Sequence, residues 1–104
     1  MDDREIVSRF WETSQSREGE VIIERIDGTR MRAVYRLDFY PQQSTLRTEA
    51  WTTNGWTTVT TVPFVEWRSR SDYTRADWME NARVDVRRAL NEATRIVPPR
   101  AHAR

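Results

Sequence analysis

A strict alternation of side-chain character over residues 31–40 constrains the fold of this chain more than any other feature. Every second residue is apolar, and most of the residues between them are charged. The apolar members are Met31, Ala33, Tyr35, Leu37 and Phe39. Successive side chains of a β-strand point to opposite faces, so this period of two predicts a strand with one buried and one solvated face. Such a sheet needs another layer to cover its apolar face.

Turn signals divide the middle of the chain into four expected strands. Asn54-Gly55, between two threonine-rich runs, is the strongest of these signals because Asn-Gly favours a two-residue hairpin turn. Pro63 ends the last strand, since proline cannot donate to a β-ladder. The strands are expected from Glu20 to the Asp27-Gly28 turn, over 31–40, over 45–53 and over 56–62.

Two segments have the spacing of amphipathic helices. Residues 2–15 place Ile6, Val7, Phe10 and Trp11 at i, i+1, i+4 and i+5, which predicts an N-terminal helix. After a loop over 64–73, the segment 74–97 carries one apolar arc and ends before two prolines. That arc consists of Met79, Ala82, Val86, Ala89, Leu90, Ala93 and Val97, and Thr74 is the expected cap with Asp77 three positions on.

The predicted architecture is an α+β two-layer sandwich. It has a four-stranded antiparallel meander with the N-terminal and C-terminal helices on one face, in the order α-β-β-β-β-α. A chain of 104 residues is long enough for one well-buried core. We therefore expect a single domain over 1–97 and a flexible tail over 98–104.

The turns also suggest a register. If 41–44 form a four-residue loop, Asp38 lies opposite Arg47, Arg36 opposite Glu49, and Val34 opposite Trp51. A two-residue loop at Asn54-Gly55 pairs Trp51 with Thr58, so the two tryptophans lie diagonally on one face. In the first hairpin, a loop with an odd number of residues ending on a positive-φ Gly28 keeps Val21 and Ile23 on the same face as Ala33 and Tyr35.

This register predicts a charged surface on the side of the sheet away from the helices. Its charged residues are expected to be Glu20, Glu24, Arg32, Arg36, Asp38, Arg47 and Glu49, crossed by an apolar spine of Ile22, Val34, Trp51 and Trp56. Threonines 48, 52, 57 and 61 are expected on the helix side. The predicted partner-binding residues are Ile22, Val34, Trp51, Trp56, Arg32, Arg36 and Arg47.

Composition argues against an enzyme. The chain has no cysteine and no lysine, and its one histidine, His102, lies in the expected tail. Thiolate catalysis, Schiff-base chemistry and Cys-ligated zinc are therefore excluded. The carboxylates are expected beside arginines on a solvated sheet, where general acid catalysis has no desolvated setting. Only three glycines occur, without a phosphate-binding motif, and we expect no catalytic residue, no metal and no cofactor.

The expected function is protein interaction. Two tryptophans left uncovered would form an apolar patch of the kind that marks an interface, unless the loop over 64–67 covers them. An open sheet also favours self-association, and a two-fold homodimer is the commonest closed solution. We therefore expect a homodimer, or a complex with another protein, of unknown biological process.

Single-stranded nucleic-acid binding is the alternative, with arginines and tryptophans of the same face as a stacking platform. The net charge is only +1, divided into −2 for residues 1–50 (eight Arg, ten acids) and +3 for residues 51–104 (nine Arg, six acids). Acids on the same face compete with phosphate for the arginines. A small apolar ligand between sheet and helices has no sequence feature in its favour.

Membrane association is not expected. The first ten residues contain no apolar run of secretory length, and no segment approaches the roughly 20 apolar residues of a membrane span. We expect a cytoplasmic protein.

Overall fold

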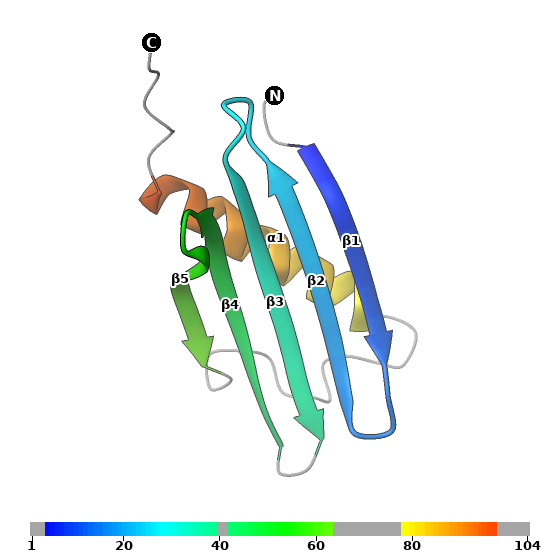
Figure 1. The fold of residues 1–104 in the computed structure, drawn as a ribbon. Helices are drawn as coiled ribbons and strands as arrows, with labels where there is room; N and C mark the ends of the chain where they lie inside the picture. Colours follow the sequence, from blue (N-terminus) through cyan, green and yellow to red (C-terminus); the bar gives the residue numbers. More distant parts are fainter. Residues whose placement is uncertain (1–3, 40–41, 64–77, 98–104) are drawn as a thin grey trace.

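The structure, a computed structural model, describes residues 4–39, 42–63 and 78–97. They form a five-stranded antiparallel sheet and one helix that lies across one of its faces (Figure 1). Each strand pairs with its neighbours in the chain, so the sheet is a simple meander with β1 and β5 at its edges. The elements are β1 (Arg4–Glu12), β2 (Ser16–Glu24), β3 (Arg30–Phe39), β4 (Gln42–Thr52), β5 (Gly55–Pro63) and α1 (Trp78–Ile96).

The core lies between α1 and the three central strands. The alternating apolar residues of β3 are buried as predicted, with Met31, Ala33, Tyr35 and Leu37 almost completely covered. Facing them, α1 buries one stripe at helical spacing: Trp78, Ala82, Val86, Leu90 and Ala93. Full burial of one large apolar side chain contributes about 1.5–3 kcal/mol, so this layer is the main source of stability.

The expected C-terminal helix is present, with a change at its first turn. Trp78, and not Met79, faces the sheet, and Met79 is exposed. At the other end, the Arg25 guanidinium donates to the backbone carbonyls of Thr94 and Val97. The last carbonyls of a helix have no partner within it, so an arginine from the β2–β3 loop caps α1 and suits its dipole. The expected cap at Thr74 and Asp77 lies outside the described residues.

The predicted N-terminal helix is wrong: that segment is β1, and the four-stranded α-β-β-β-β-α arrangement becomes five strands followed by one helix. The α+β class and the antiparallel sheet stand. The error has a physical cause, because β1 carries a bulge at Ile6, between the pairs Glu5–Ile23 and Val7–Ile22. The extra residue of a bulge changes which face the following side chains point to, so the apolar residues of the strand no longer recur at every second position.

Gly19 supports the pairing of β1 with β2. The expected connection over 14–19 belongs mostly to β2, which begins at Ser16. Gly19 lies directly opposite Phe10 of β1, and a β-carbon at position 19 would lie 2.2 Å from a carbon of the Phe10 ring. The missing side chain therefore lets Phe10 lie over the backbone of β2 and reach the core, where it packs edge-to-face against Trp78.

In the first hairpin the odd loop length and the predicted faces are confirmed, but the loop ends at Thr29 and not at Gly28. Its loop contains the five residues 25–29, Gly28 has a positive φ, and Val21 lies opposite Ala33. The pairing of β3 with β4 differs from the prediction. Arg36 lies opposite Thr45 rather than Glu49, a shift of four residues, because β4 already begins at Gln42 and the loop is shorter. An even shift preserves the side-chain parity, so each residue keeps its predicted face.

The turn between β4 and β5 also differs. Thr52 pairs with Gly55, and Trp51 lies directly opposite Trp56. No non-glycine residue has a positive φ in the described part of the chain, so Asn54 does not adopt the turn type expected for Asn-Gly; Gly55 alone has the positive φ. A bulge at Thr48 and Glu49 then moves Thr60 opposite Thr48 and puts Thr61 on the side away from α1, contrary to prediction.

Replacing Gly19 with alanine tests the close packing of β1. We expect Gly19→Ala to lower the free energy of unfolding by about 1–3 kcal/mol, the usual range for overpacking. This loss is expected even though alanine loses less backbone entropy on folding than glycine does. Urea denaturation measures the change. In a Phe10→Ala background the same substitution is expected to have little effect, and an equal loss in both backgrounds would contradict the assigned contact.

Candidate interaction surface

The side of the sheet opposite α1, here named the open face, has no described element over it (Figure 1). Besides Ser16 and Gln43, which lie opposite Asp38, register and strand alternation place twenty side chains on it. They are Arg4, Val7, Arg9 and Trp11 of β1; Glu18, Glu20, Ile22 and Glu24 of β2; Arg30, Arg32, Val34, Arg36 and Asp38 of β3; Thr45, Arg47, Glu49 and Trp51 of β4; and Trp56, Thr58 and Thr61 of β5. This surface is a mixture of ion pairs and separate apolar groups.

A continuous chain of ion pairs crosses four strands of the open face. Arg9 bonds Glu20 at 2.8 Å, and Arg32 bonds the other oxygen of Glu20 at 3.3 Å. Arg32 also donates through Nε to Glu49 at 2.6 Å, and Arg47 donates to the second oxygen of Glu49 at 2.7 Å. Each inner member therefore has two partners of opposite charge, which makes a network rather than isolated surface pairs.

Two shorter groups of ion pairs flank this chain. Glu24 is shared by Arg4 at 2.7 Å and Arg30 at 3.4 Å. Arg36 bonds Asp38 at 2.9 Å and lies 3.5 Å from Glu18. The charges that the open face presents to solvent are thus already compensated within the molecule.

The arginines lower the pKa of two of these carboxyl groups. Burial alone would raise the pKa of Glu49, but hydrogen bonds from Arg32 and Arg47 outweigh it and hold the pKa below its usual range. The pKa of Glu24 is lowered by hydrogen bonds from Arg4 and Arg30. Both groups are therefore ionised at neutral pH, unlike a carboxyl tuned to act as a general acid.

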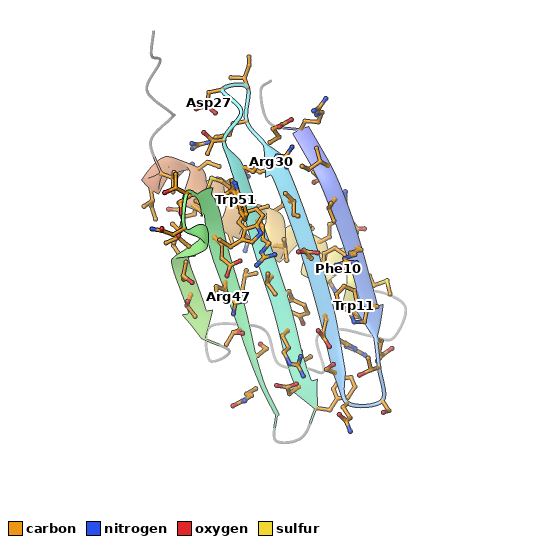
Figure 2. The ribbon with its side chains drawn as sticks, viewed as in Figure 1. Phe10, Trp11, Asp27, Arg30, Arg47 and Trp51 are labelled. Atoms are coloured by element: carbon orange, nitrogen blue, oxygen red, sulfur yellow. The ribbon has the colours of Figure 1, made fainter. Side chains whose placement is uncertain are left out.

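The two tryptophans form an exposed aromatic pair at one end of the open face. Their ring centroids are 5.3 Å apart with the planes at 70°, an edge-to-face contact. The Arg32 guanidinium lies 4.5 Å from the ring centre of Trp56, and Trp56 is partly covered. Trp51 keeps 53% of its surface exposed, and it lies further along β4 than Arg47 (Figure 2). The loop over 64–67, expected as its alternative cover, lies outside the described residues.

All seven residues predicted as partner-binding lie on the open face, but they do not form a continuous apolar spine. Trp51, Trp56 and Arg32 are brought together. Val34 lies opposite Arg47 rather than Trp51, and Ile22 lies opposite Arg32, so both aliphatic residues are half-buried among charges. Arg36 belongs to a separate group of ion pairs.

Sequence reasoning missed the contribution of β1 to this surface. The segment interpreted as a helix adds two arginines, Val7 and the exposed Trp11, above whose ring Arg9 lies at 5.4 Å. A usable signal was the density of β-branched and aromatic residues at 6–11, which favours a strand, together with Gly19 across from Phe10.

Every arginine of the described ranges has a partner. On α1 and β1, Arg83 and Arg87 bond Glu5, and Arg83 also bonds Ser8. Arg88 and Arg95 pair with acids three positions before them on the helix. Free arginines that could neutralise phosphate are therefore not found in this part of the chain.

One buried arginine lies on the helix side of the sheet. The Arg17 guanidinium is held between the rings of Phe39 and Trp78, at 5.6 and 5.2 Å, and donates to Glu12 at 3.1 Å. Its Nη1 and the hydroxyl of Ser44, two strands away, are buried without a hydrogen-bond partner. The interior near Trp78 thus contains two unsatisfied polar atoms, each of which reduces stability.

The described residues contain no cluster of three His, Cys, Asp or Glu side chains that could hold a metal ion. Burial raises the pKa of Tyr35 to about 12, so its hydroxyl is not a proton donor or acceptor for chemistry at neutral pH. Within the same ranges, no helix combines the length and apolar character needed to span a membrane. Comparison with known proteins finds no matching family model, no similar curated protein and no similar solved structure.

Removing the Glu49 carboxylate tests the ion-pair chain. Glu49→Gln leaves Arg32 with one fewer charged partner, and we expect a loss of about 1–3 kcal/mol in the free energy of unfolding at pH 7. Because the folded-state pKa is lowered, this contribution is present above the unfolded value of about 4.3 and is lost as pH falls through the folded value. Urea denaturation at several pH values should show the two proteins converging in acid.

The matched control is Glu92→Gln on α1. Glu92 also pairs with an arginine, but at 3.5 Å and with both side chains largely exposed, so stability should barely change. A similar loss for both variants would show that the Glu49 network contributes no more than an ordinary surface pair.

Proposed function

We propose that this protein is a small non-enzymatic interaction domain that self-associates through the open face, with Trp51 as the main apolar residue of the contact. The observation that carries this proposal is the exposure of Trp51, which packs edge-to-face against Trp56 and lies outside the core. A rigid, half-exposed tryptophan offers a large apolar area at little entropic cost, as in the central residues of known interfaces.

A second copy suits this surface because the surrounding charges are paired. The network around Glu49 needs no counter-charge from a partner, so two open faces can meet without leaving an uncompensated ion at the contact. A two-fold contact also places each Trp51 against the same surface of the other copy. The flanking arginines and acids then form the polar rim that is typical of non-obligate interfaces.

The size of the sheet supports the same proposal. Five strands about 4.8 Å apart, each about nine residues long, give a face of roughly 20 by 30 Å. A stable interface buries about 800 Å² on each partner. A face of about 600 Å² is somewhat smaller than this, so the whole open face would take part, and the expected dimer is weak rather than tight.

Single-stranded nucleic-acid binding has one observation in its favour, namely that Trp51 offers a ring on which a base could stack. Binding of nucleic acid also needs free positive charge. Arg32 and Arg47 share Glu49, and Arg36 is paired with Asp38, so phosphate would have to displace carboxylates already in contact. We therefore favour a protein partner, and expect a cytoplasmic location.

Charge introduction at Trp51 tests the proposed dimer. We expect the wild-type protein to be dimeric at about 100 μM, a trial concentration suited to weak affinity, and Trp51→Arg to be monomeric. Multi-angle light scattering after size exclusion measures the mass, and far-UV circular dichroism checks that the fold is kept.

The matched control is Val84→Arg, which adds the same charge at an apolar residue of α1 that is 46% exposed. It should remain dimeric. A wild-type monomer at this concentration, or equal loss of the dimer in both variants, would rule out the open face as the contact.

Retention on heparin separates the two functions. Our proposal expects elution below about 0.1 M salt, because paired arginines release few counterions. Strong retention that falls steeply with salt, and that is lost in Trp51→Ala, would instead support binding of a single-stranded nucleic acid.

A further inference from the structure

Over β1, β2 and β3 the charges of the open face alternate from strand to strand, and this alternation stops at the edge formed by β1. Arginines occupy β1, glutamates occupy β2, and arginines predominate on β3. Glu24 pairs with both Arg4 and Arg30. Glu20 pairs with both Arg9 and Arg32. Among the described residues, no strand lies on the outer side of β1 to continue the series (Figure 1).

The arginines at this edge are paired on one side only. Arg32, inside the sheet, contacts a carboxylate on each side, and its side chain is 23% exposed. Among the carboxylates of the described residues, Arg9 pairs only with Glu20 and its side chain is 65% exposed, and Arg4 pairs only with Glu24 and its side chain is 74% exposed. Each edge arginine thus has a carboxylate on the β2 side only, whereas Arg32 has one on each side of its strand.

The backbone of β1 is suited to accept such a neighbour. After the bulge at Ile6, residues Val7–Glu12 pair with β2 without a further shift, giving a regular edge of six residues. An edge strand has outward N–H and C=O groups that can bind an extended peptide by β-augmentation. Trp11 lies on the same face as Arg9 and two residues further along, and it is exposed (Figure 2).

We propose that β1 binds an acidic, extended segment of another protein as a sixth strand. The segment pairs with Val7–Glu12 and places a carboxylate beside Arg9, so that Arg9 has one carboxylate on each side, as Arg32 already has. An apolar side chain two positions away covers Trp11. The partner strand therefore alternates acidic and apolar residues on one face.

The two edge strands of a second copy do not supply these groups. On the open face, β1 has two arginines, Val7 and Trp11, and β5 has Trp56, Thr58 and Thr61, so neither edge has a carboxylate there. Pairing β1 with itself around Arg9 would bring two arginines together, which destabilises a cross-strand pair. The edge interaction therefore uses the backbone edge of β1, whereas the dimer proposed above uses the open face itself.

Binding can be measured with the synthetic peptide Thr-Glu-Thr-Val-Thr-Glu-Thr, whose symmetric pattern fits either strand direction. Fluorescence anisotropy of a labelled peptide gives the affinity at low salt. We expect the glutamine analogue to bind at least about fivefold more weakly, and the arginine analogue not to bind. Methylation of alternate peptide nitrogens should also abolish binding, because it removes hydrogen-bond donors without changing the charge.

Two variants of the full chain locate the site. Arg9→Gln should weaken binding of the glutamate peptide about two- to fivefold, the effect of one exposed ion pair. Arg36→Gln is the matched control, because Arg36 is also exposed on the open face but belongs to an inner strand, and it should leave the affinity unchanged. Hydrogen exchange should show new protection of amides within residues 7–12.

Three outcomes would overturn the proposal. Equal binding of the glutamate and glutamine peptides would show that the carboxylates do not contribute to the affinity. Protection of amides at residues 55–61 instead of 7–12 would assign binding to the β5 edge. Protection of 7–12 that rises with protein concentration in the absence of peptide would identify a second copy as the occupant. Loss of the dimer in Trp51→Arg leaves peptide binding to β1 intact if both proposals hold.

Discussion

One helix cannot cover both faces of a five-stranded sheet, and the rest of this structure follows from that constraint. The apolar stripe of α1 covers the side with Met31 and Tyr35. The other side must remain compatible with water while its side chains lie only about 5 Å apart across strands. Like charges at that spacing would repel, and a fully apolar surface would aggregate. Alternating arginine and carboxylate strands satisfy both requirements, and Glu49, with Arg32 and Arg47 on its two oxygens, is the most buried member of the network.

The face on which each side chain of the sheet lies was predictable, because a register error by an even number of residues leaves every side chain on the same face. The predicted pairing of β3 with β4 was wrong by four residues, yet Leu37 remained in the core and Arg32 outside it. The contacts within a face were less predictable, since they depend on loop length and turn type. Trp51 and Trp56 became direct partners because the positive φ lies at Gly55 and not at Asn54.

The N-terminal segment shows where periodicity fails. A bulge at Ile6 and aromatic residues on both faces, Phe10 inward and Trp11 outward, produce a spacing that a helix would also give. Local pattern alone cannot resolve this ambiguity, because the deciding contact is made with Gly19 across the β1–β2 hairpin. The same error hid the edge arginines, so the candidate site was predicted on four strands when it extends over five.

The presence of arginine rather than lysine at position 32 has a structural explanation in this network. Arg32 donates through Nε to Glu49 and through Nη1 to Glu20, so one side chain bridges two carboxylates on opposite sides of its strand. Its guanidinium also lies against the ring of Trp56. A lysine has a single ammonium group and no planar surface, and could not make these three contacts in a fixed geometry. The guanidinium of Arg32 therefore contacts both the ion-pair network and the tryptophan pair. The same side chain thus contributes to the stability of the sheet and to the surface that we propose as the dimer contact.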